Sequence, residues 1–289
     1  MAINREIWTI RKVLEWTRGY LAEKGIDNAR LEAEWLLSAS LAMDRVGLYV
    51  NFDQPLNQDE LAAFRGRVAR RARREPLQYI LGSQEFCGLD FEVTPAVLIP
   101  RHDTEVLVTE ALRLASDAKT VLDIGVGSGC IAVALAKALP AATVSGIDAS
   151  AAALAVARRN AARHGVDIAL SEGSLFAPLA GQRFDLIVSN PPYIPSADLA
   201  TLQPEVREFE PVTALDGGPD GLEFYRLIVA EAPAHLAVGG WLLVEVGIDQ
   251  AGPVTALFAA HGFGDCFTAK DPNGIERVVG GRAPERRPQ

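Results

Sequence analysis

The chain has 289 residues, 49% of them hydrophobic, so it carries enough apolar material for packed cores and is long enough for two domains. Its formal net charge of −9 argues against a protein that binds nucleic acid through its overall field. No run approaches the roughly 20 apolar residues of a membrane span, and the first residues lack the apolar run of a secretory signal, so we expect a cytoplasmic protein with no membrane contact. Three widely spaced cysteines and four histidines indicate neither a disulfide framework nor a metal site.

The first part of the chain predicts helices. One apolar stripe recurs at alternating steps of four and three residues, and its members are Ile3, Ile7, Ile10, Leu14 and Leu21. A second helix is expected around Leu31, Trp35 and Leu36. A third is expected from Asn57 to Glu75, where Pro76 ends it. Residues 1–76 are therefore expected to form a small helical domain.

Six arginines lie on the third expected helix, between Arg65 and Arg74. They are consistent with a solvated helix face, or with a docking surface for an acidic partner or for RNA in a ribonucleoprotein.

Residues 77–95 change character, because aromatic and β-branched residues are broken there by Gly82 and Gly88. This composition predicts a β-hairpin that links the helical domain to the rest of the chain.

From about Lys119 strands and helices alternate, which specifies a parallel sheet covered by helices on both faces. The expected elements are strand Thr120–Ile124, helix Cys130–Leu139, strand Thr143–Ile147, helix Ala151–His164, strand Asp167–Leu170 and strand Phe184–Ser189. A helix near Leu222–Leu236, strand Trp241–Val246, helix Gln250–His261 and two late β runs, Gly264–Ala269 and Glu276–Val279, suggest a closing antiparallel edge. Residues 96–289 are therefore expected to form an α/β domain.

A glycine-rich turn, Gly125–Gly129, follows the first strand of this domain and opens a helix. Its spacing is G-x-G-x-G, and Cys130 stands where a dinucleotide fingerprint would need its third glycine. Asp123 precedes the turn by two residues, where a carboxylate suits a cationic ligand and repels a pyrophosphate. At the end of the next strand, Asp148 is placed to accept both hydroxyls of a ribose, to cap the following helix, or to do both.

Together these residues resemble the S-adenosylmethionine site of seven-stranded, Rossmann-like methyltransferases. The resemblance implies an α/β fold with a seven-stranded sheet and S-adenosylmethionine as cofactor, with S-adenosylhomocysteine as product and no metal. The cofactor-binding residues expected on this basis are Asp123, Gly125, Val126, Gly127, Ser128, Gly129, Asp148, Leu175 and Asn190.

A rigid loop, Asn190-Pro191-Pro192-Tyr193, follows the strand that ends at Ser189. An amide or exocyclic amine is a poor nucleophile, so its nitrogen must be held in line with the methyl group. The Asn190 side-chain oxygen and the Pro191 carbonyl can each accept one N–H, which aims the lone pair. Tyr193 can wall the site, and no general base is needed before attack. The alternative is that the loop is an ordinary Asn-Pro turn with no role in the reaction.

This loop is shared with amino-methylating DNA and RNA enzymes, but its surroundings are not. The chain resembles the release-factor glutamine methyltransferases over nearly its whole length, through the segments Glu75–Gly82, Glu85–Phe91, Val97–Glu105, Glu210-Pro211, Ala214-Leu215, Gly217-Gly218, Asp220–Leu222, Glu245–Gly247 and Asp271–Gly274. This sequence departs from the family pattern at three places. His102 stands where the family has a proline, Val126 and Ser128 stand where it has threonines, and Gly173–Phe176 lacks the family's acid before the hydrophobic pair. The last departure leaves Leu175 as an apolar cover for adenine.

The resemblance implies a reaction. Its substrate would be the glutamine of the Gly-Gly-Gln motif in class-1 peptide-chain release factors, gripped with the help of the helical domain, and the enzyme would be a monomer without direct DNA binding. Asn190, Pro191 and Tyr193 would be catalytic and, with Pro192, would bind substrate. The alternatives are a glutamine methyltransferase of a ribosomal protein, an amino-methylating nucleic-acid enzyme, which would need a basic target-recognition region, and a silent cofactor-binding protein.

Overall fold

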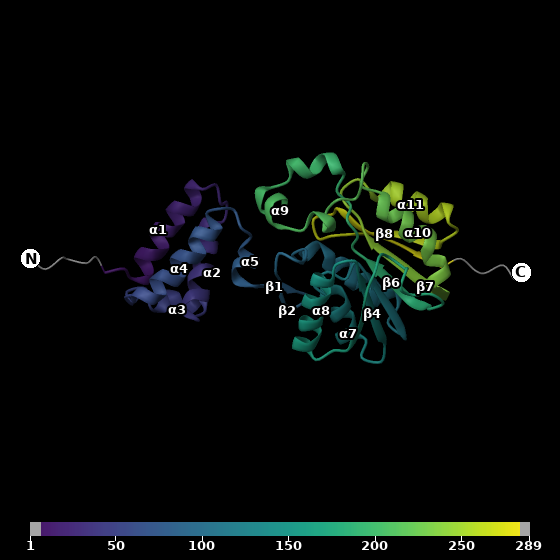
Figure 1. Ribbon diagram of the computed structural model, residues 1–289, viewed down its shortest axis with the longest axis horizontal. Coiled ribbons are helices and arrows are strands. Elements are labelled where there is room, and N and C mark those ends of the chain that lie inside the picture. Colours follow the sequence, from purple (N-terminus) through teal and green to yellow (C-terminus); the bar gives the residue numbers. More distant parts are fainter. Residues whose placement is uncertain (1–6, 284–289) are drawn as a thin grey trace, which may run out of the picture. The chain divides into compact units, whose positions relative to one another are not determined.

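The computed structural model describes residues 7–283, and these divide into two compact units. The helical unit comprises the chain up to Gly82 together with a distant segment, Pro204–Phe209. The sheet unit comprises Ser83–Gln203 and the chain from Glu210 onward. Figure 1 shows the helices and strands of each unit.

The helical unit packs short helices around one apolar core. Its helices are α1 (Ile10–Glu23), α2 (Ala29–Leu41), α3 (Arg45–Val50), α4 (Gln58–Arg71), α5 (Leu77–Leu81) and α9 (Pro204–Phe209). The core is formed by side chains such as Ile10, Leu21, Leu36 and Phe64, each at most 3% exposed. α4 begins with a capping box, in which the Asn57 and Glu60 side chains each accept the other residue's backbone N–H.

Several helix predictions for this unit need correction. Ile3 lies outside the described residues, and Ile7 precedes α1 and is 66% exposed, so the core side of α1 instead includes Val13 and Thr17. The second helix is confirmed as α2, which carries Leu31, Trp35 and Leu36, although only Leu36 of these is buried. The third helix, α4, ends at Arg71 rather than Glu75 because a turn follows it.

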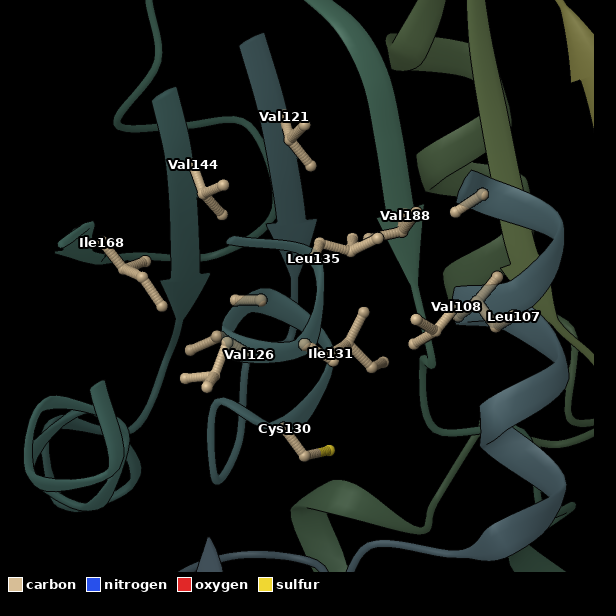
Figure 2. Packing of buried hydrophobic residues seen from close by; sticks show 14 of the residues in the cluster. Leu107, Val108, Val121, Val126, Cys130, Ile131, Leu135, Val144, Ile168 and Val188 are labelled. Atoms are coloured by element: carbon tan, nitrogen blue, oxygen red, sulfur yellow. The ribbon is translucent and has the colours of Figure 1, made fainter. Parts of the chain in front are cut away.

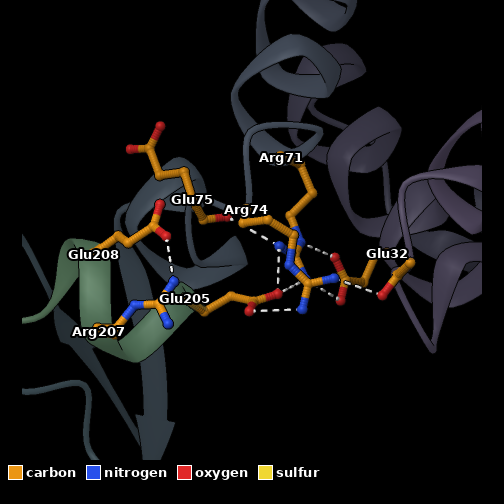
Figure 3. A network of polar contacts seen from close by, with 8 residues as sticks. Glu32, Arg71, Arg74, Glu75, Glu205, Arg207 and Glu208 are labelled. Atoms are coloured by element: carbon orange, nitrogen blue, oxygen red, sulfur yellow. Dashed lines mark hydrogen bonds and ion pairs between the residues drawn. The ribbon is translucent and has the colours of Figure 1, made fainter. Parts of the chain in front are cut away.

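Several arginines of α4 and of the turn after it form ion pairs within the helical unit (Figure 3). The Arg71 side chain is 6% exposed, and its guanidinium lies between the carboxylates of Glu32 and Glu205, while Arg74 Nη2 donates to Glu205 at 2.8 Å. Arg70 pairs with Glu75.

Two arginines of the stripe, Arg65 and Arg73, are exposed. Their side chains form no hydrogen bond or ion pair with any described residue. The basic stripe is therefore largely structural. It binds α9, which follows the Asn190 loop in sequence, into the helical unit.

The sheet unit opens with the predicted hairpin, which is shorter than expected. β1 (Ser83–Phe86) and β2 (Leu89–Glu92) pair antiparallel, with Phe86 opposite Leu89. The first part of the expected hairpin is α5, because Tyr79 and Ile80 are buried as helix residues there.

The main sheet has seven strands in the order β5-β4-β3-β6-β7-β9-β8. Their bounds are β3 (Thr120–Ile124), β4 (Thr143–Asp148), β5 (Ile168–Glu172), β6 (Phe184–Ser189), β7 (Leu236–Glu245), β8 (Gly264–Lys270) and β9 (Glu276–Arg282). The first five strands in this order are parallel, and β9 pairs antiparallel with β7 and β8, which confirms the predicted closing edge. This is the seven-stranded, Rossmann-like sheet expected from the sequence.

Helices cover both faces of the sheet, because successive strand residues point to opposite sides. On one face, Val121 packs with α6 (Glu105–Leu114), α7 (Cys130–Ala138) and α8 (Ala151–His164) (Figure 2). On the other, the adjacent Leu122 packs with α10 (Glu223–His235) and α11 (Ala251–Ala260). The expected helices match α7, α8, α10 and α11 to within a residue or two, whereas α6 was not predicted.

Two composition-based expectations can be compared with the described residues. Among them, no helix is long and apolar enough to cross a membrane. All three cysteines are free thiols, of which Cys130 is buried and Cys87 and Cys266 are partly exposed.

Candidate active site

A cavity of about 650 Å³ lies in the sheet unit at the carboxyl ends of the central strands. Ile124, Asp148 and Ser189, from the ends of β3, β4 and β6, line it. Open α/β sheets bind ligands at this edge, and the volume falls in the range of small-molecule sites.

The glycine turn forms one wall of the cavity. Gly125, Gly127 and Gly129 all have positive φ values, of 74°, 52° and 83°, which favour glycine over residues with a Cβ. At Gly129 an added Cβ would also lie 3.2 Å from the Ala157 Cβ, so α7 and α8 can approach only because the side chain is absent. Residues 125–128 line the cavity, while Gly129 caps α7 behind it.

Asp148 lines the same cavity from the end of β4. Its Oδ2 accepts the Gly127 N–H at 2.9 Å and its Oδ1 accepts the Ser150 N–H at 2.8 Å. Each carboxylate oxygen keeps a lone pair for a further donor. The cap of α8 is the Ser150 side chain, which accepts from the Ala153 N–H, so Asp148 is not needed for that role.

Asp123 lies behind the glycine turn and does not line the cavity. Its side chain is fully buried, with Oδ2 accepting the Ala132 N–H at 3.1 Å and Oδ1 receiving no hydrogen bond from the described residues. Burial raises the pKa of this carboxyl to about 7, and the charge of Asp148 adds to the effect. Asp123 therefore holds the start of α7 from behind the turn and does not contact the cavity.

An apolar wall faces the glycine turn. Leu175 lines the cavity with a left-handed backbone, at a φ of 50°, beside the exposed Ser174. Phe224 and Ile228 of α10 line it as well. These side chains suit the flat face of an aromatic ring.

Asn190, Pro191 and Pro192 reach the same cavity from the end of β6. The Asn190 side-chain nitrogen donates to the Thr104 hydroxyl at 3.2 Å, and its side-chain oxygen receives no hydrogen bond from the part of the chain that the structure describes. The expected cofactor residues and the expected acceptor loop thus share one cavity, apart from Asp123, Gly129 and Tyr193.

Tyr193 is the member of the acceptor loop that does not line the cavity. Its ring packs against the core on the α10 side, and its hydroxyl lies 3.4 Å from Glu245 Oε1. Burial and the nearby charge of Glu245 raise the pKa of this phenol. The wall that we expected from Tyr193 is supplied by other residues, so this side chain acts as a support of the loop.

A second loop holds the acceptor loop in place. The Gly217 N–H donates to the Ile194 carbonyl at 2.8 Å, and the Gln250 side chain donates to the Tyr193 carbonyl at 2.9 Å. A Cβ at Gly217 would lie 2.7 Å from the Tyr193 Cα. Sequence reasoning noted the glycines but missed Gln250.

Two buried polar residues at the site were also missed. Asn160 of α8 is fully buried and donates to the Ser128 carbonyl at 2.8 Å, which fixes the glycine turn. The sequence feature that could have indicated Asn160 is that it is the one amide among the apolar residues on the buried side of α8. Glu210 is 5% exposed and accepts from the Ile99 N–H at 3.1 Å and from Arg101, which lines the cavity. Among the described residues, no cluster of His, Cys, Asp and Glu could hold a metal ion.

Comparison with known proteins links this site to methyltransferases. Residues 12–82 match the PrmC N-terminal domain, and residues 102–203 match the methyltransferase small domain. The chain is 74% identical to a release factor glutamine methyltransferase of Geobacter sulfurreducens, over 98% of this chain and 99% of that protein. It is 43% identical to one of Chlorobaculum tepidum, over 95% and 97%. A methyltransferase structure from Pyrococcus furiosus shares the fold, with a TM-score of 0.51 and 20% identity over 69% of this chain and 91% of that one.

Proposed function

Because the chain belongs to the family of release factor glutamine methyltransferases, we propose that it transfers a methyl group from S-adenosylmethionine to the glutamine of the Gly-Gly-Gln motif in class-1 release factors. The acceptor is the side-chain amide nitrogen. The observation that carries the proposal is that Asn190, Pro191 and Pro192 line the same cavity as the glycine turn and Asp148.

The residues at the cavity fit S-adenosylmethionine, which supplies an electrophilic methyl group on a sulfonium. Asp148 has lone pairs free for the ribose hydroxyls, and Leu175 offers an apolar cover to the adenine ring. The glycine turn presents backbone without side chains, so a ligand can approach it closely. A cation in front of the turn favours the ionised form of Asp123 behind it, so the two would stabilise each other.

The acceptor loop positions the glutamine. An amide nitrogen attacks poorly because its lone pair is delocalised, so the protein must fix its direction. The free side-chain oxygen of Asn190 accepts one N–H of the substrate amide, and the Pro191 carbonyl accepts the other. The nitrogen lone pair is then aimed into the cavity, and the amide that gains the methyl group loses a proton to water.

The helical unit supplies a surface for the release factor. It exposes tryptophan side chains, a type enriched where protein interfaces gain most of their binding energy, with Trp16 at 54% and Trp35 at 44% exposure. A large protein substrate is bound through such a surface, whereas one glutamine in a cavity would provide little affinity.

The test is methyl transfer measured by mass spectrometry. The purified protein is incubated with cofactor and a class-1 release factor, and in parallel with that factor carrying alanine at the motif glutamine, with ribosomal protein and with RNA. We expect one methyl group on the intact release factor and none in the other three reactions. Methylation of RNA or of the ribosomal protein instead would overturn the proposal.

Asn190→Ala tests the chemistry within the same assay. Loss of the positioning hydrogen bond should lower the single-turnover rate by about two to three powers of ten, with release factor binding affected much less. A variant within about threefold of the wild-type rate would make Asn190 a turn residue, since a positioning bond has a larger effect.

A further inference from the structure

A short chain of polar side chains runs from the cavity into the core of the sheet unit. It starts at Asn190, whose side-chain nitrogen donates to the Thr104 hydroxyl at 3.2 Å. Thr104 is 2% exposed, and its side chain also interacts with the carboxyl group of Glu245, a residue at the end of β7 that is itself 2% exposed. None of this was assigned from the sequence, where Thr104 was only part of a matching segment.

Thr104 is the last residue of a short 3-10 helix, His102–Thr104, which runs directly into α6. Its backbone is helical, with φ of −67° and ψ of −20°, and its side chain caps no backbone N–H of α6. The hydroxyl lies instead against Asn190.

Glu245 determines the direction of the hydrogen bonds. Burial raises the pKa of this carboxyl to about 7, the Thr104 hydrogen bond and the charge of Arg277 lower it, and Asp103 raises it again. Once ionised, the carboxylate can only accept, so the hydroxyls of Thr104 and Tyr193 both donate to it. Its Oε2 receives no hydrogen bond from the described residues, so a Thr104 hydroxyl turned away would leave the charge poorly compensated.

The direction of the Thr104 hydroxyl also determines the orientation of the Asn190 side chain. A Thr104 hydroxyl that donates to Glu245 offers only lone pairs to its other neighbour, so Asn190 must present its NH₂ group to Thr104. The Asn190 oxygen is then left for the cavity. A flipped Asn190 would place its NH₂ group there instead, and two N–H donors cannot bind the N–H of a substrate amide.

We propose that Thr104, held by Glu245, is a positioning residue that keeps the Asn190 side-chain oxygen directed at the acceptor amide. The inference rests on the proposed function, because it assigns to Thr104 a task in that reaction. It predicts that the Thr104 hydroxyl affects the rate of methyl transfer only through Asn190.

The test compares Thr104→Val, which keeps the side-chain shape without the hydroxyl, with Thr104→Ser, which keeps the hydroxyl. Single-turnover transfer to the release factor is measured at a pH above the Glu245 pKa, with both substrates saturating. Thr104→Val should lower the rate about thirtyfold or more, and Thr104→Ser should restore most of it. Thr109→Val, which removes an exposed hydroxyl from the same helix, should leave the rate unchanged.

A double-mutant cycle separates positioning from a general structural effect. In the Asn190→Ala background, Thr104→Val should have no further effect on the rate, because the group that it orients is gone. Cofactor affinity by calorimetry and the thermal midpoint should stay near wild type for Thr104→Val. Additive effects in the cycle, or equal rates for the valine and serine variants, would overturn the inference. A wild-type protein inactive on release factors would instead overturn the proposed function.

Discussion

The ion-pair cluster around Arg71 predicts a large and local loss of stability when its cation is removed. Arg71 donates Nη1 and Nη2 to Glu205 at 3.0 Å each and pairs through Nε and Nη2 with Glu32. Arg71→Met keeps most of the buried stem but leaves both carboxylates without this partner. Removing one partner of a buried ion pair costs about 3–5 kcal/mol.

The expected value lies at the lower end of that range. The Glu32 and Glu205 side chains keep 15% exposure, and Arg74 still donates to Glu205 at 2.8 Å. Both features reduce the charge left uncompensated, so we expect a loss of about 3 kcal/mol in the free energy of unfolding of the helical unit. Arg65→Met, an exposed position on the same helix, should change it by less than about 0.5 kcal/mol.

The assay uses the distribution of tryptophans. Trp8, Trp16 and Trp35 lie in the helical unit, and Trp241 is the fourth of the chain's four tryptophans. In a Trp241→Phe background, urea unfolding followed by fluorescence therefore reports on the helical unit. A cycle with Glu205→Gln should give a coupling of about 1–2 kcal/mol. Equal stability of Arg71→Met and Arg65→Met, or the absence of coupling, would refute the reasoning.

Three further outcomes follow from the described contacts. Asp148→Ala should weaken cofactor binding by about 1–3 kcal/mol, the cost of unpaired polar partners, and unchanged calorimetric affinity would remove Asp148 from the site. Gly129→Ala should lower the midpoint of thermal unfolding, because φ is 83° and the new Cβ would lie 3.2 Å from that of Ala157. An unchanged midpoint would show that α8 moves to accommodate the methyl group. Although burial raises the pKa of Glu205, a backbone hydrogen bond and the bonds from Arg71 and Arg74 lower it overall, so its contribution to stability is present above the unfolded pKa and declines as the pH falls through the folded one. Acid titration of the urea midpoint should show this decline in wild type and a smaller one in Arg71→Met.

The local sequence pattern was sufficient to predict those helices and strands whose own residues indicate where they begin and end. The bounds of β3, α8 and β6 agree with the predictions to the residue, because apolar strands and an alanine-rich helix alternate with clear turns. The glycine turn and the Asn190 loop could be placed at one sheet edge for the same reason, since the carboxyl ends of parallel strands meet there.

Contacts between distant residues could not be predicted in this way. Arg71 and Glu205 are 134 residues apart, and nothing in either segment indicates the other. The α5 helix forms where hairpin residues were expected because burial of Tyr79 and Ile80 outweighs their strand preference. Tyr193 was expected at the cavity wall from its chemistry alone, but the direction of a side chain after two prolines depends on what packs around it.

The assignment of α9 to the helical unit has a consequence for how this enzyme can be divided. The chain passes from one unit to the other at Gly82, at Gln203 and at Phe209, so no single cut yields two complete bodies. A fragment that starts at Ser83 would retain α9 but lack Arg71 and Arg74, the partners of Glu205. Exchange of the N-terminal segment between relatives would succeed only if the six residues of α9 were exchanged with it. Recombination should therefore treat these two stretches as one inherited block.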